Sequence, residues 1–278
     1  MKNYNIALRP IHYACVSGGK DSLYMFRLLC DNQDKYPLDM VVHYDLEIDY
    51  PFVKNVVDYI EKCCKALGIK FVRVKPEQSY WDLLSTYGVA KRQYRWCNSL
   101  YKMSCVKQIE KWIKEQNCRP VAYIGLCADE QNRFKYTVGN IVDGQDVVYP
   151  LAEEGVLESD ILEWAKDVDI FDSWYSYFNR QGCMYCPNAT YRELAYMYIC
   201  YNYQFEWFMT QCINDEERTK SGVFQSNPKY NSKYVYTRVR EHYVPIMWEE
   251  MKEKKHPITE SKELVYHGKL AYIKNRKE

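Results

Sequence analysis

The residues best suited to bind phosphate form a short loop near the N-terminus, between a predicted strand and a predicted helix. Gly18 and Gly19 let the backbone turn sharply and approach a ligand closely. Successive N–H groups at the start of a helix form a nest that favours an anion, and the adjacent Lys20 adds a positive charge. We therefore predict that residues 17–22 bind the phosphates of a nucleotide.

The polar residues of this loop extend its chemistry. Ser17 and Ser22 supply hydroxyl donors, and Asp21 either holds Mg²⁺ or caps the helix. The order is not that of a Walker A loop, because Lys20 is followed by an acid and the glycine spacing differs. A Gly-Gly turn that only caps a helix is the simpler alternative, and the surrounding Ser, Lys and Asp disfavour it.

Cysteine spacing indicates a second candidate site. The chain has 12 cysteines, and Cys183 and Cys186 are spaced so that two thiolates can reach one metal or one cluster iron. A redox pair or chance spacing is the alternative. Cys63 and Cys64 continue an apolar helical stripe and are expected in the core. Two others are kept as candidate fourth ligands, namely Cys105 and Cys127.

Composition restricts the class of protein. A chain of 278 residues that is 47% hydrophobic can build one large domain, or one domain with an appendage. The net charge of +1 gives no general basic field, so charge alone does not argue for nucleic-acid binding. No segment resembles a signal peptide or a membrane span, so we expect a cytoplasmic protein without a disulfide framework.

Apolar runs alternate with helical patterns over the first part of the chain. This alternation predicts an α/β fold, a doubly wound and mostly parallel sheet with helices on both faces. Ser159 is the expected N-cap of the last of these helices. The expected strands are 12–17, 40–47, 70–74 and 121–127, and the expected helices are 21–30, 53–67, 103–118 and 161–168.

The pattern changes at about Phe171 to aromatic-rich helices and loops. We therefore expect a nucleotide-binding α/β domain at 1–170, followed at 171–278 by the Cys-x-x-Cys segment and a helical region. Tyrosines at 191–203 and mixed basic and aromatic residues at 229–242 suit a nucleic-acid surface. A core helix followed by a solvated charged face is the favoured alternative, because acidic residues follow closely.

The loop at 17–22 resembles the signature of the N-type ATP pyrophosphatases, the PP-loop superfamily. Four further segments resemble the phosphoadenylylsulfate (PAPS) reductase-like branch, in the order of that family and over about residues 12–190. These segments are His43-Tyr44-Asp45-Leu46-Glu47 with Pro51, Arg95-Trp96-Cys97-Asn98 with Lys102, residues 125–133, and Tyr149-Pro150-Leu151.

The resemblance implies an adenine nucleotide alpha hydrolase-like fold and cleavage of ATP to AMP and pyrophosphate. It implies that Lys20 stabilises charge on the phosphates, that Asp21 and Asp45 hold Mg²⁺, and that Arg133 contacts phosphate. In proteins of this family the cysteine that matches Cys97 approaches a later Cys-x-x-Cys pair. Cys97, Cys183 and Cys186 are therefore the candidate metal ligands.

Three thiolates fit either of two metals. Zinc needs a fourth ligand, whereas a [4Fe–4S] cluster held by three cysteines keeps one iron open. The second arrangement is similar to that of some PP-loop enzymes that thiolate tRNA, and there the open iron can carry the incoming sulfur. We favour the cluster, with Zn²⁺ as the alternative.

Two departures from the family pattern guide the choice of function. Cys127 stands where the family often has Arg, and no cysteine follows Cys212, whereas a thioredoxin-coupled sulfonucleotide reductase needs one near its C-terminus. We expect a sulfurtransferase-type enzyme that couples ATP-dependent adenylation to sulfur transfer, with a nucleic acid or a partner protein as candidate partner. The alternatives are a PAPS or APS reductase with an altered mechanism and a non-catalytic nucleotide-binding subunit.

Overall fold

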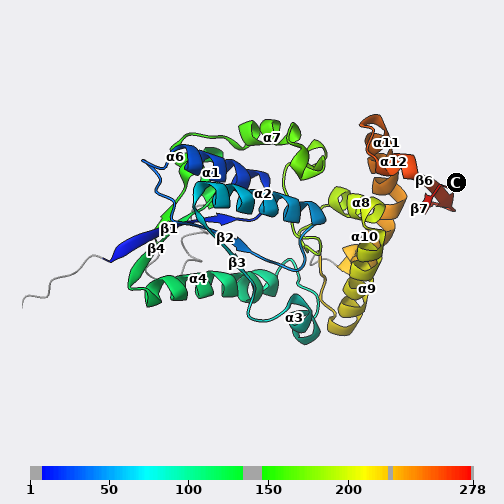
Figure 1. Cartoon of the computed structure of the whole chain (residues 1–278). Helices are drawn as coiled ribbons and strands as arrows, with labels where there is room; N and C mark the ends of the chain where they lie inside the picture. The colour runs from blue at the N-terminus through cyan, green and yellow to red at the C-terminus, as the bar shows by residue number, and fades with distance from the viewer. Residues whose placement is uncertain (1–7, 134–145, 225–227, 277–278) are drawn as a thin grey trace, which may run out of the picture. The chain divides into compact units, whose positions relative to one another are not determined.

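The computed structural model describes residues 8–133, 146–224 and 228–276 (Figure 1). By its internal contacts the chain forms two compact units. The first comprises Met1–Tyr80 and Asn98–Gln181, and the second comprises Trp81–Cys97 and Gly182–Glu278. The domains 1–170 and 171–278 remain a prediction, because a compact unit is defined by contacts and a domain by independent folding.

The first unit is built on a five-stranded sheet in which every neighbouring pair is parallel. The strand order is β3-β2-β1-β4-β5, so the chain leaves β1 toward one edge and returns to its other side with β4. Ligands of such sheets bind at the carboxyl ends of the strands where the order reverses. The strands are β1 (Arg9–Val16), β2 (Met40–Tyr44), β3 (Lys70–Val74), β4 (Cys118–Tyr123) and β5 (Asp146–Val148).

Helices cover both faces of this sheet, which confirms the predicted fold class (Figure 1). In the part of the chain that the structure describes, one face carries α1 (Lys20–Asp31) and three helices that contact it, and the opposite face carries one long helix. The four are α1 (Lys20–Asp31), α2 (Pro51–Leu67), α6 (Pro150–Glu153) and α7 (Glu158–Lys166), and the single helix is α4 (Met103–Glu115).

Local signals explain where these helices begin and end. α2 buries most of the predicted apolar stripe, including Cys64, whereas Cys63 is half-buried and Leu67 is exposed, and the helix ends at Gly68 in the left-handed region. The expected N-cap of α7 is wrong. α7 begins at Glu158, so Ser159 lies inside the first turn and Leu157 occupies the cap, where its N–H donates to Asp160 Oδ2 at 3.3 Å.

The core between the sheet and α4 holds one of the candidate metal ligands. Cys105 is buried there, and its thiol donates to the Val74 carbonyl at 3.6 Å. It therefore serves as a core residue, as a small apolar side chain does. Its neighbours in this cluster are Tyr13, Met40, Val42, Val74, Ile109, Ile113 and Ala122.

The second unit is mainly helical, and a C-terminal hairpin not expected from the sequence completes it. The Tyr196 and Tyr198 side chains of α8 (Tyr191–Cys200) are buried, whereas Tyr203 is 79% exposed. Part of the tyrosine content therefore builds the core. The elements are α3 (Tyr80–Tyr87, all but its first residue), α8 (Tyr191–Cys200), α9 (Asn202–Thr219), α10 (Ser232–Arg238), α11 (Val244–Glu253), α12 (Ile258–Ser261), and the antiparallel strands β6 (Lys262–His267) and β7 (Leu270–Asn275).

A buried arginine organises several of these tyrosines. Arg240 is 4% exposed, and its guanidinium carbon lies 4.2 Å from the ring centre of Tyr272, 5.0 Å from that of Tyr236 and 5.3 Å from that of Tyr198. Its Nε donates to the Ala271 carbonyl at 3.3 Å. Cation–π contacts of this kind link the hairpin to the helices within the second unit.

Within the ranges that the structure describes, no helix combines the length and the apolar character needed to cross a membrane.

The turn between β1 and α1 requires glycine at position 18. Gly18 has φ +76°, and a Cβ there would lie 2.7 Å from Val53 Cγ1 and 3.2 Å from the Val53 carbonyl oxygen. Both the backbone conformation and the packing of α2 therefore exclude a side chain. This close packing sets the position at which α1 begins.

We expect Gly18→Ala to destabilise the protein more than Gly68→Ala does. Gly68 has a similar φ of +71°, but no atom lies within 4 Å of the place that a Cβ would occupy, so its substitution adds backbone strain of about 1 kcal/mol and no clash. The clash with Val53 should add roughly 1–3 kcal/mol at Gly18. Urea unfolding of both variants measures the difference in the free energy of unfolding. Equal losses of stability would show that α2 moves away from the added Cβ without destabilising the protein.

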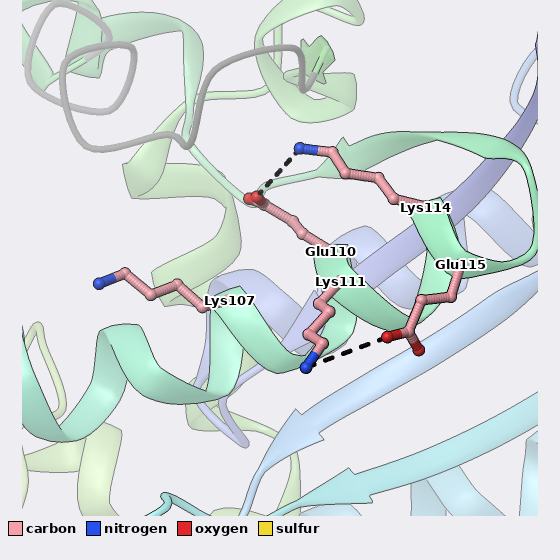
Figure 2. A pocket seen from close by; sticks show the side chains of 5 residues that line it. All are labelled: Lys107, Glu110, Lys111, Lys114 and Glu115. Carbon is pink, nitrogen blue, oxygen red and sulfur yellow. Dashed lines mark ion pairs between the residues drawn. The ribbon is translucent and has the colours of Figure 1, made fainter.

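A buried carboxylate on α4 makes stability depend on pH. Glu110 is 2% exposed, accepts no hydrogen bond within the described part of the chain, and lies 4.0 Å from Lys114 Nζ (Figure 2). Burial raises the pKa of Glu110 above its ordinary value, although Lys114 opposes the shift. The surrounding surface hollow is lined by Lys107, Glu110, Lys111, Lys114 and Glu115.

We expect Glu110→Gln to stabilise the protein at high pH and to change little at low pH. A raised pKa in the folded state means that the stabilisation is complete below the unfolded pKa, about 4.3, and is lost as pH rises through the folded pKa. The gain should reach about 1–2 kcal/mol by pH 8. Thermal melts at pH 4 and pH 8 test this, with the exposed Glu115→Gln as control. A gain that is equal at both pH values would contradict it.

Candidate active site

The predicted phosphate loop is braced by its own hydroxyl groups. The N–H of Ser17 donates to Ser22 Oγ at 3.2 Å, and the Ser22 hydroxyl donates to the Gly19 carbonyl at 2.9 Å. Ser22 is buried and Ser17 is exposed. The loop therefore holds its shape through Ser22, while Ser17 remains open to solvent.

Lys20 is buried within this loop and is held by two carboxylates. Its side chain is 1% exposed, and Nζ lies 2.7 Å from Asp21 Oδ1 and 3.3 Å from Glu158 Oε1. Burial alone would lower the pKa of Lys20, but the two carboxylates outweigh it and raise the pKa, so the ammonium stays charged. Glu158, at the start of α7, was not found from the sequence.

The carboxylates around Lys20 outnumber it. Burial raises the pKa of Asp21 against the pull of Lys20, and the negative charges of Glu130 and Glu158 act in the same direction as burial. The surplus negative charge disfavours a bare anion at this site and favours one that arrives with a cation. The arrangement therefore suits a nucleotide bound together with a divalent metal.

The segment 125–133 closes on the start of α1. A Cβ on Gly125 would lie 3.1 Å from the Asp21 carbonyl oxygen, so glycine permits the close approach. Cys127 is buried, and its thiol donates to Asp21 Oδ1 at 4.0 Å. Burial raises the pKa of Cys127 to about 12, so this residue is a protonated thiol, which is a poor nucleophile and metal ligand.

Acidic side chains of the same segment fix its position. Glu130 Oε2 accepts the N–H of Cys127 at 3.2 Å, and Asp129 Oδ1 accepts the N–H of Glu158 at 3.1 Å. Arg133, predicted to contact phosphate, forms an ion pair with Glu130, and its side chain is 63% exposed. The ion pair with Glu130 thus holds the guanidinium beside the segment 125–133. The contact of Arg133 with phosphate stays a prediction.

The end of β2 carries a histidine and an acid in different roles. His43 is buried and its Nδ1 lies 2.9 Å from the Val16 carbonyl, and burial lowers the pKa of His43, so the ring is neutral. Asp45 is half-buried, and its N–H continues the strand pairing to the Val74 carbonyl. No hydrogen bond or ion pair joins Asp45 to Lys20 or Asp21 among the residues described.

Two further acids follow on the same segment. Glu47 Oε2 accepts the N–H of Tyr80 at 3.0 Å, and the Glu47 N–H donates to the Tyr101 hydroxyl at 3.1 Å, so this residue has a structural role. Burial raises the pKa of Asp49 to about 7, where Asp45 adds to the shift and Lys102 opposes it. Asp49 is therefore a group with a titration near neutrality that sequence reasoning missed.

The three predicted thiolate ligands are all half-buried, and they lie at the start of a helical turn and in the Cys-x-x-Cys segment. Cys97 begins a π-helical turn, Cys97–Lys102, and Cys186 folds back so that its Sγ is 3.8 Å from a Cβ built on Gly182. Over the described residues no group of three or more His, Cys, Asp or Glu side chains is arranged to hold a metal. The ligand set of Cys97, Cys183 and Cys186 thus stays a prediction.

Two solved structures are similar to the chain at low identity. The phosphoadenylyl-sulfate (PAPS) reductase of Candida auris, solved as a phosphate complex, is 13% identical with a TM-score of 0.39, over 64% of this chain and 83% of that one. The U34-tRNA thiolase NcsA of Methanococcus maripaludis, solved with its [4Fe-4S] cluster, is 17% identical with a TM-score of 0.41, over 90% of this chain and 75% of that one.

Two uncharacterized proteins of Methanocaldococcus jannaschii are relatives in sequence. One is 28% identical over 195 residues, which cover 68% of this chain and 43% of the relative. The other is 32% identical over 112 residues, which cover 40% of this chain and 21% of the relative. The chain thus spans less than half the length of either relative.

The match to a protein family covers most of the first unit, and from the second unit it includes Trp81–Cys97 and both cysteines of the Cys-x-x-Cys pair. The family model of the phosphoadenosine phosphosulfate reductase domain matches residues 11–189, a range that includes the loop at 17–22 and all four segments of the predicted resemblance. This match confirms the resemblance. The chain belongs to the phosphoadenosine phosphosulfate reductase domain family.

Proposed function

We propose that this chain binds ATP at residues 17–22 and transfers the adenylyl group of ATP to an oxygen atom of a substrate. A sulfur atom from a donor then replaces that oxygen. The observation that carries the proposal is the charged, buried Lys20 at the N-terminus of α1, beside a glycine turn that no side chain can enter. A fixed cation and a helix N-terminus together favour a polyphosphate. Family membership supports the adenine nucleotide as the ligand class.

The proposed reaction has two steps. The substrate oxygen attacks the α-phosphorus of ATP, the bond from that phosphorus to the bridging oxygen breaks, and pyrophosphate leaves with the bonding electrons. A sulfide-level sulfur nucleophile from the donor then attacks the activated carbon, and AMP leaves with the original oxygen and the bonding electrons, so the step needs no oxidant or reductant. Lys20 stabilises the charge that develops on the departing pyrophosphate.

Other residues of the site support this first step. Asp21 and Asp45 are proposed to hold Mg²⁺, and the surplus of carboxylates around Lys20 supports a cation there. Arg133 is proposed to contact phosphate, since most of its side chain is exposed although it pairs with Glu130. Glu158 would release Lys20 to the phosphates once the nucleotide and its metal neutralise the site.

Cys97, Cys183 and Cys186 are proposed as the thiolate ligands of a [4Fe–4S] cluster, with Zn²⁺ as the alternative. Their support is the Cys-x-x-Cys spacing and the presence of all three within one compact unit. Over the described residues these side chains are not arranged as a metal site, and the adenylation step does not involve the cluster. Such a cluster would supply an open iron for the incoming sulfur.

We expect Lys20→Ala to reduce ATP-dependent pyrophosphate release by about 10²–10³-fold, since it removes a charge that acts on the leaving group. Pyrophosphate release is measured with candidate acceptors, a transfer RNA pool among them. Lys252→Ala, on the exposed face of α11, is the control and should leave the rate unchanged. Undiminished release by Lys20→Ala would refute the proposal, and tight ATP binding without release under any condition would favour a non-catalytic subunit.

We expect about four irons and four sulfides per chain in protein purified without oxygen, because three cysteines can hold a [4Fe–4S] cluster. The double variant Cys183→Ser/Cys186→Ser should lose them, whereas Cys63→Ser, half-buried on α2, should retain them. Iron, acid-labile sulfide and zinc are determined together. Stoichiometric zinc without iron would contradict the cluster and establish the alternative metal.

A further inference from the structure

A tyrosine from a distant part of the chain contacts the phosphate loop. Tyr175 lies in the 3₁₀ turn Trp174–Ser176, within the same compact unit as the loop. Its phenol oxygen accepts the N–H of Lys20 at 2.9 Å, and its side chain is 2% exposed. The two residues are 155 positions apart in the sequence, so the fold rather than local structure creates this contact.

The N–H that Tyr175 engages is one of those on which anion binding depends. Lys20 is the first residue of α1, and the first amides of a helix have no partner within the helix. Such amides bind phosphate in nucleotide-binding loops. Tyr175 therefore acts at the position where the phosphates of a bound nucleotide are expected.

The same phenol also lies over the loop backbone. A Cβ on Gly19 would lie 3.4 Å from the Tyr175 hydroxyl and 2.9 Å from Gln181 Oε1. The two side chains therefore pack against the loop backbone on the side where a Cβ of Gly19 would project. The ring of Tyr175 packs edge-on against Phe171, with the centroids 4.8 Å apart, and both rings are buried. This packing restricts the position of the hydroxyl.

The hydroxyl keeps a hydrogen-bond donor available. A phenol that accepts a hydrogen bond still carries its own proton. Burial raises the pKa of Tyr175 above its ordinary value, so the group stays protonated at physiological pH. Within the described ranges no acceptor is paired with this O–H, which lies near the Lys20 amide and in the field of Asp21.

We propose that Tyr175 is a phosphate-positioning residue, whose oxygen holds the Lys20 amide while its O–H donates to a phosphate oxygen of the nucleotide bound at residues 17–22. This inference rests on the proposed nucleotide binding and adds to it a donor from outside the loop. One side chain thus orients both the loop and its ligand. Because the hydroxyl is fixed before binding, its donation costs little conformational entropy.

Tyr175→Phe tests the donor with little change in packing, since the ring against Phe171 is retained. Calorimetric titrations with ATP, pyrophosphate and adenosine are compared for wild type and variant. We expect the Kd for ATP and for pyrophosphate to rise about tenfold, as for one hydrogen bond to a charged group, and the Kd for adenosine to stay unchanged. Tyr123→Phe is the control, because it removes a phenol that donates to the Pro37 carbonyl at 3.0 Å.

The outcomes separate this inference from the function on which it rests. If Lys20→Ala loses ATP binding while Tyr175→Phe keeps wild-type affinity, the inference is overturned and the nucleotide site stands. An equal loss of ATP and adenosine in Tyr175→Phe assigns the phenol to loop structure alone and also overturns it. Absence of ATP and pyrophosphate binding in wild type overturns both. Phe171→Leu keeps the hydroxyl but loosens its support, and a smaller loss of ATP affinity is expected there.

Discussion

The ion pair of the buried Lys20 ammonium with two carboxylates is the interaction on which the first unit depends. Asp21 comes from the same helix turn, whereas Glu158 begins α7, so the pair joins α1 to α7 on one face of the sheet. Lys20 is the buried member, whereas Asp21 and Glu158 are 34% and 42% exposed, so removing a carboxylate weakens the compensation of the buried ammonium. The first unit therefore contains a buried charge whose desolvation costs stability. A nucleotide site is the role that best explains why the charge is there.

The elements around this centre are linked by backbone contacts that tolerate little change. Gly18 packs against α2, and Gly125 packs against the backbone of Asp21, so that the segments after β1 and β4 meet without side chains between them. Asp129 then connects the second segment to the start of α7. Both strands end where the order of the sheet reverses, which is why a single site forms there.

Sequence reasoning found what local patterns encode. The parallel sheet, the stripe of α2 and its end at Gly68 follow from periodicity and capping, and the glycine turn between β1 and α1 follows from its residue types, whereas phosphate binding by this turn stays a prediction. It missed Glu158 and Tyr175, whose contacts with Lys20 span 138 and 155 residues and leave no periodic trace. It also missed β5, because three residues are too few to show an alternating pattern.

The excess of carboxylates beside Lys20 has a consequence for how ligands enter. At the proposed site an approaching triphosphate would meet a Lys20 ammonium that is already paired with two carboxylates, so the charge of the triphosphate would be repelled until a counterion is shared. On the proposed function, metal and nucleotide would be thermodynamically linked, and each would raise the affinity for the other by the same factor. Such a site would discriminate against the uncomplexed nucleotide through electrostatics.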